Sequence, residues 1–451
     1  MSVQELFDSR RYDVVGSWIG DGEIQCTDGS SWHSECEAIF LGEGTPRVFC
    51  ALPQDINRLR MWTTNIASVS VSCGETRLRS SGNIVHSTLY GEHSQRYDLA
   101  LLLRRMIASP ALGNDSTPSS LCFSLTNLLS FPAPGCDIRP IEVKLALKGL
   151  GERKIVVEPV SGFGNRKDRC RLLRSPQITA RLRVPIESDE EISAAESDVT
   201  DICTLLSLAE GCVVNWVKYD VLGESDGVVR QVFCSRKSGS YAPLKLVNMD
   251  MADYLAKTYP VYMRRSAEWS VGREVVVAYL EGKDETDYLE TRAAKLALAL
   301  EMIVDKICEA RGFSTTVLRD FGPLNQDLRK AIENHVCDSA KRAKLYERLR
   351  GLNRVSFRAK IEFVSGQVKT PFEREELDRF VKSRNSLVHE GKFYVQLPES
   401  EQVENAKPFD TIWEEYCSMT HTMDKLLLRI AGYSGKYLDP RKVWETYREL
   451  P

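Results

Sequence analysis

The sequence predicts an α+β fold in two domains: a β-rich N-terminal region of sandwich or barrel type, followed by an all-helical bundle. A chain of 451 residues is too long for a single core. Up to about residue 185 the apolar residues alternate or occur in short runs, as in strands, and after residue 281 they recur at helical spacing. We therefore expect a β-rich region at residues 1–283, with a subdomain from about residue 196, and a helical domain at residues 284–451.

The clearest strand patterns in the β-rich region lie at residues 66–72 and 180–184, where apolar and polar residues alternate. A helix is expected at residues 197–208, with Ser197 as its N-cap and Gly211 as its stop. Two further strands are expected after it, at residues 213–219 and 230–233. The region up to about residue 185 should therefore form an antiparallel sandwich or barrel, and the helix and two strands after it should either complete the β-rich unit or form a small bridging subdomain.

The strongest helical pattern follows residue 284. Residues 288–310 place leucine, isoleucine and valine near one face, and Gly312 ends the pattern. Further helices are expected at residues 324–352, 373–388 and 410–432. The C-terminal unit should therefore be a bundle of four or five helices.

Composition restricts the classes of function. The net charge is −3, so any contact with nucleic acid must be local rather than a matter of bulk charge. The 13 cysteines occur singly, without a Cys-x-x-Cys pair, which predicts neither a disulfide framework nor a zinc site. The polar N-terminus and the absence of an apolar run near 18 residues predict no signal peptide and no membrane contact, and together with free thiols they favour a cytoplasmic location.

The common catalytic signatures are absent from the sequence. There is no phosphate-binding loop of the Gly-x-x-x-x-Gly-Lys type, no Gly-x-Ser-x-Gly elbow and no His-Glu-x-x-His zinc motif. Gly162, Gly164 and Asn165 do not open a convincing helix after a strand, so we expect an ordinary turn there. Of the six histidines, three lie in the β-rich region and are expected to be surface or strand residues, and His421 is expected on the bundle surface.

His389 differs because of its neighbours. Residues 384–389 read Arg-Asn-Ser-Leu-Val-His inside the helical unit. This run resembles the Arg-x(4 to 6)-His signature of HEPN domains, in which a polar residue, here Asn385, often follows the arginine. The His-Glu-Gly sequence and the long helix that carries Leu300 and Glu301 also resemble the HEPN domains that follow an ApeA-type N-terminal region. Two other arginine–histidine pairs have a similar spacing, and one of them, Arg329 with His335, remains a second candidate.

The resemblance implies cleavage of RNA without a metal or cofactor, and the residue types suit that chemistry. Histidine exchanges a proton near neutrality, since its ordinary pKa is about 6.5. The Arg384 guanidinium stays charged and can grip a phosphate through two hydrogen bonds, and Asn385 can orient it. A five-residue separation places Arg384 and His389 about 140° apart around a helix. A symmetric homodimer with a shared groove would bring both residue types to one phosphate, and the resemblance implies the same arrangement.

A basic stretch in the helical unit is a candidate RNA track. Such a run is usually a solvated helix face, but beside an arginine–histidine groove it could follow an RNA backbone. Its members are Lys341, Arg342, Lys344, Arg348, Arg354 and Arg358.

The resemblance also implies a biological role. HEPN domains behind a β-rich region resemble bacterial anti-phage effectors of abortive infection, in which the N-terminal part senses a phage-derived trigger and the helices cleave cellular RNA such as tRNA. Two other hypotheses stay open. The helical unit could be a non-catalytic HEPN scaffold that binds RNA, a nucleotide or a protein. Alternatively, the β-rich region could be a ligand-binding domain whose helices serve only to dimerise.

Overall fold

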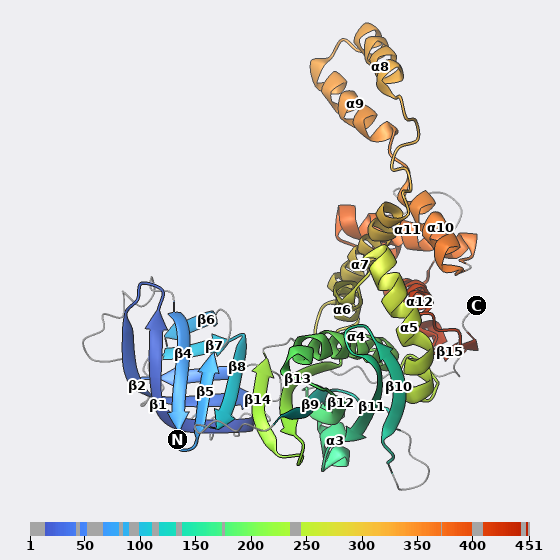
Figure 1. Ribbon diagram of the computed structural model, residues 1–451. Helices are drawn as coiled ribbons and strands as arrows, with labels where there is room; N and C mark the ends of the chain where they lie inside the picture. Colours follow the sequence, from blue (N-terminus) through green and yellow to red (C-terminus); the bar gives the residue numbers. More distant parts are fainter. Residues whose placement is uncertain are drawn as a thin grey trace.

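The structure is a computed structural model in which strands dominate the N-terminal half and helices the C-terminal half (Figure 1). This confirms the expected α+β organisation at that level. The described residues are 14–41, 46–51, 66–80, 84–89, 99–110, 117–131, 138–173, 176–234, 245–370, 372–398, 409–442 and 448–449.

The described strands of the N-terminal half form one antiparallel sheet in the order β10-β11-β12-β9-β13-β14-β8-β5-β4-β1-β2-β3-β7-β6. These strands therefore belong to one continuous sheet. Its strands are β1 (Val14–Cys26), β2 (Ser31–Leu41), β3 (Pro46–Cys50), β4 (Ile66–Cys73), β5 (Thr76–Ser80), β6 (Ile84–Leu89), β7 (Leu99–Leu103), β8 (Arg105–Pro110), β9 (Pro118–Thr126), β10 (Ile141–Leu147), β11 (Gly151–Pro159), β12 (Ile178–Pro185), β13 (Asn215–Gly223) and β14 (Val228–Cys234).

The first part of the sheet, β1 to β8, curls on itself. β4 contacts β6 although four strands separate them in the sheet order. Alternate residues of its strands meet in one apolar core, since successive side chains of a strand point to opposite faces. Members of this core are Ile24, Cys36, Val48, Val69, Leu78, Leu101 and Met106.

The two parts of the sheet join where β8 pairs with β14. Residues 105–108 pair with residues 231–234, and Phe233 of β14 is buried in the core of the first part. Beside this seam Arg105 forms an ion pair with Glu196 at 2.7 Å, and the Tyr219 hydroxyl donates to the same carboxylate at 2.6 Å. The seam is therefore stabilised by backbone hydrogen bonds, by the buried Phe233 side chain and by the polar cluster around Glu196.

Helix α4 (Ile192–Glu210) packs on β13 in the second part of the sheet (Figure 1). It ends at Gly211, as expected, because this glycine adopts a left-handed conformation with φ of 73°. Its start was predicted wrongly. Ser197 lies inside the helix, which begins five residues earlier because Ile192 and Ala195 are buried against the core.

The expected turn near Gly162 was also wrong in part. Gly162 does turn the chain, with φ of 70°, but helix α3 (Phe163–Leu173) follows β11 directly. Helix α3 was not predicted because it is rich in charged residues and has no apolar stripe at helical spacing. The buried side chains of Phe163 and Cys170 contact Leu129 and Cys212.

Two unexpected helices, α5 (Met251–Trp269) and α6 (Arg273–Glu281), connect the sheet to the bundle. On α5 the Tyr254 hydroxyl donates to the carbonyl of Leu205, and the Tyr259 hydroxyl donates to Asp198, both on α4. The apolar core runs without a break from the second part of the sheet into the bundle. The domain boundary at residue 284 falls in the turn after α6 and stays a prediction.

The bundle is built around α7 (Leu289–Ala310), which contacts α5, α6, α10, α11 and α12. The expected helix at residues 288–310 is confirmed, and its apolar face is buried. The remaining long helices are α8 (Gly322–His335), α9 (Ser339–Leu352), α10 (Phe357–Val368), α11 (Arg374–Glu390) and α12 (Ile412–Ile430). A short sheet of β15 (Lys436–Tyr437) and β16 (Arg448–Glu449) follows. In the described ranges, no helix is both long and apolar enough to cross a membrane.

The single helix expected at residues 324–352 was wrong. It is a hairpin of α8 and α9 that projects from the bundle (Figure 1). The break occurs where Asp338 caps α9 by accepting hydrogen bonds from the backbone N–H groups of Ala340 and Lys341. We call residues 322–352 the arm.

His421 does not lie on the bundle surface as expected, but in a buried ionic cluster between α11, α12 and the C-terminal segment. Its Nδ1 lies 3.3 Å from Asp439, and Glu376 pairs with Lys425 at 2.9 Å. Burial alone would raise the pKa of the Asp439 carboxyl, but hydrogen bonds from Arg441 and the proximity of His421 lower it to about 2. The cluster fastens α11 to its neighbours.

Candidate active site

Helix α11 carries the three residues that the sequence predicts as a catalytic group. It buries Leu377, Phe380 and Leu387 on one face and ends at Gly391, whose φ of 68° suits a glycine. The opposite face of its last two turns is exposed. The candidate residues are Arg384, Asn385 and His389.

Arg384 is held in place by three neighbouring groups. Its Nε and Nη2 contact the carboxylate of Glu301 on α7, and its Nη1 donates to the Asn385 side-chain oxygen at 2.9 Å. The guanidinium carbon lies 5.2 Å from the centre of the Phe357 ring, at the start of α10. Since three of its five N–H donors are used in this way, two remain for a phosphate.

His389 lies in the last turn of α11 and is exposed. Within the described part of the chain, its ring forms no hydrogen bond and no ion pair. Asn385 is also exposed, whereas only 19% of the Arg384 side chain is. The structure therefore brings Arg384 and Asn385 into contact, and it leaves His389 available on the surface of the same helix.

Glu301 is the functional candidate to which sequence reasoning gave no role. It is separated from Arg384 by 83 positions, so spacing along the chain could not pair the two. The signal in the sequence was an acidic residue beside Leu300, next to the apolar stripe of α7; in the structure Glu301 is half-buried there.

The second arginine–histidine candidate lies in the arm. Arg329 lies over the Tyr346 ring at 5.0 Å, and its Nε reaches the Asn325 side-chain oxygen at 3.4 Å. His335 is exposed at the end of α8. Arg329 therefore contributes to the packing of the two arm helices against each other.

The predicted RNA-binding residues fall into two groups. Lys341, Arg342, Lys344 and Arg348 lie on α9, and Arg354 follows it. Arg358 belongs instead to the bundle, where it pairs with Glu362 at 2.9 Å and with Asp378.

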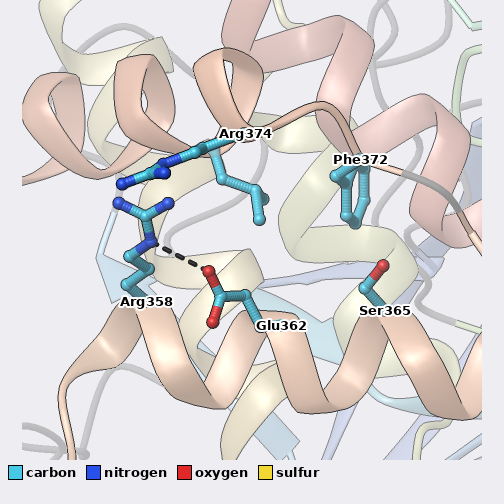
Figure 2. Close-up of a pocket in the computed structure, with 6 residues that line it drawn as sticks. Arg358, Glu362, Ser365, Phe372 and Arg374 are labelled. Carbon is cyan, nitrogen blue, oxygen red and sulfur yellow. Dashed lines mark hydrogen bonds and ion pairs between the residues drawn. The ribbon is translucent and has the colours of Figure 1, made fainter.

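A pocket of about 480 Å³ lies between α10 and α11 (Figure 2). Its lining includes Arg358, Glu362, Phe372 and Arg374. Figure 2 shows the two guanidinium groups close together at one end and the Phe372 ring at the other. Because Glu362 and Asp378 already balance the charge of Arg358, the pocket offers an anion less attraction than its two arginines suggest.

Comparison of the chain with protein-family models, with curated protein sequences and with solved structures found no match. Any functional conclusion must therefore come from the site itself.

Proposed function

We propose that the chain is a metal-independent endoribonuclease of HEPN type, with a site formed by Arg384, Asn385 and His389 of two copies. One observation carries the proposal: a firmly positioned guanidinium and an exposed histidine lie on the same helix of a bundle. The resemblance of residues 384–389 to the HEPN signature points in the same direction. Cellular RNA, with tRNA as one candidate, is the proposed substrate, and anti-phage defence is the proposed setting.

The chemistry follows from the residue types. His389 of one copy removes the proton of a ribose 2′-hydroxyl, whose oxygen then attacks the adjacent phosphorus. The P–O5′ bond breaks, and His389 of the second copy, in its protonated form, gives a proton to the departing 5′-oxygen. Arg384 stabilises the charge that builds on the phosphate oxygens. The products are a 2′,3′-cyclic phosphate and a 5′-hydroxyl.

Two copies are needed because of how the residues are oriented. Arg384 contacts α7 and α10, whereas the ring of His389 is exposed about 140° around the helix. One chain therefore does not direct both side chains at a single phosphate. A twofold axis beside the exposed face of α11 would supply the missing group from the second copy.

The direct test is incubation of the purified protein with total bacterial RNA in EDTA, followed by analysis of the fragment ends. We expect 2′,3′-cyclic phosphate ends from the wild type and none from Arg384→Ala. Equal cleavage by Arg384→Ala would exclude this site. A folded, dimeric wild type that binds RNA without cutting it would favour the scaffold hypothesis.

Replacing Glu301 by glutamine should lower the cleavage rate by about 10- to 100-fold, because Arg384 loses the charged partner that sets its position. The measurement is kcat/KM on a defined RNA. Glu309→Gln is the matched control, since Glu309 is exposed on the same helix. Equal rates for the two variants would show that Glu301 does not position the arginine.

A further inference from the structure

We infer that the arm binds the sugar–phosphate backbone of RNA beside the scissile bond, so that the substrate is an RNA several nucleotides longer than the cleaved step. This inference rests on the proposed function, since it names how that site selects its substrate.

The arm is built as a surface element. No residue of α8 is buried, and Leu349 is buried on α9. Its two helices are held together by Tyr346, whose ring lies against Arg329 and whose hydroxyl donates to Glu333 at 3.0 Å. A hairpin with so little core adds little to the stability of the bundle. The arm projects from the bundle (Figure 1), and its charged residues Lys341, Lys344 and Arg348 are exposed.

The charge of the arm favours a polyanion. Lys341, Lys344 and Arg348 are exposed and are spaced at three and four residues, so they share one face of α9. In the part of the chain that the structure describes, none of the three forms an ion pair. Between residues 339 and 354 Glu347 is the single acidic residue. Basic residues repeated along a helix face suit phosphates rather than base edges.

The basic face leads to the candidate active site. Arg354 is exposed where α9 returns to the bundle, and there it forms a β-bridge with Thr316. Three residues later the chain reaches Phe357, whose ring lies under Arg384. An RNA backbone bound along Lys341, Lys344 and Arg348 would therefore lead toward Arg384. An acidic protein would also be attracted to such a face, but the continuity with a phosphate-cleaving site favours RNA.

The test compares RNA affinity in a His389→Ala background, so that binding is measured without cleavage. The arm variant combines Lys341→Gln, Lys344→Gln and Arg348→Gln. Its control removes three exposed cations elsewhere, through Lys144→Gln, Arg171→Gln and Lys257→Gln. Dissociation constants for a labelled single-stranded RNA are measured by fluorescence anisotropy between about 50 and 200 mM salt.

We expect the arm variant to bind RNA at least about tenfold more weakly than the control, with a slope of log K against log salt smaller by about 2. Circular dichroism checks that both variants remain folded. Wild-type affinity and slope in the arm variant would overturn the inference, even if the wild type cleaves RNA. The inference would also be overturned if the arm variant lost binding to an acidic protein while its affinity for RNA stayed unchanged. A third outcome is that the wild type never cleaves RNA and the arm variant loses RNA binding. That result would refute the proposed function and leave the arm as an RNA-binding element.

Discussion

Replacing His389 by alanine is expected to lower the rate of RNA cleavage by about 10²- to 10⁴-fold, the usual contribution of a general acid or base. In the proposed dimer the change removes both the base and the acid, so the loss should lie toward the upper end. The stability of the protein should not change, because the ring is exposed and forms no hydrogen bond or ion pair with the described residues. The measurement is single-turnover cleavage of a defined RNA in EDTA.

His335→Ala is the matched control for this variant. His335 is also an exposed histidine in the last turn of a helix, and it belongs to the second arginine–histidine candidate. We expect cleavage by His335→Ala to remain within about twofold of the wild type. If His335→Ala were inactive and His389→Ala active, the site would have to be reassigned to Arg329 and His335.

Replacing Glu376 by alanine is expected to lower the free energy of unfolding by about 3–5 kcal/mol. Glu376 on α11 pairs with Lys425 at 2.9 Å, and its carboxylate lies 3.7 Å from His421. The side chain of Lys425 is only 6% exposed, so the change removes a carboxylate partner from a buried ammonium. Urea denaturation followed by circular dichroism measures the loss.

Two comparisons test the cause of this loss. Glu375→Ala changes the adjacent residue, whose side chain is 82% exposed, and should alter stability by no more than about 0.5 kcal/mol. Adding Lys425→Met to Glu376→Ala should restore at least about half of the loss, because an apolar side chain replaces the buried ammonium that lost its Glu376 partner. No recovery in the double variant would show that the packing of Glu376, rather than charge compensation, stabilises the junction of α11 and α12.

Periodicity in the sequence predicted the helices that bury an amphipathic face, α7, α11 and α12, to within a few residues. It did not separate α8 from α9, because helical spacing continues through the capping residue Asp338. Helix α10 was missed although Ile361, Val364 and Val368 repeat at helical spacing and are buried. Periodicity reports local amphipathicity, and neither caps nor tertiary packing can be read from it with the same certainty.

Only those residues of the candidate site that are close together in the sequence could be predicted. Arg384, Asn385 and His389 lie within six residues of one another, so a motif could group them. The residues that position Arg384 come from other helices, Glu301 from α7 and Phe357 from α10. Contacts between distant segments depend on how the helices pack, which no pattern within one segment contains.

The seam between β8 and β14 bears on how the chain folds during its synthesis. Residues 105–108 of β8 pair with residues of β14 that are synthesised about 120 residues later. At ribosomal rates of about 5–20 residues per second, one edge of β8 stays unpaired for roughly 6–25 s. An open strand edge is a template for pairing with another chain. The newly made N-terminal part should therefore be the stage most prone to aggregation and most dependent on chaperones, and synthesis of β14 should end that period.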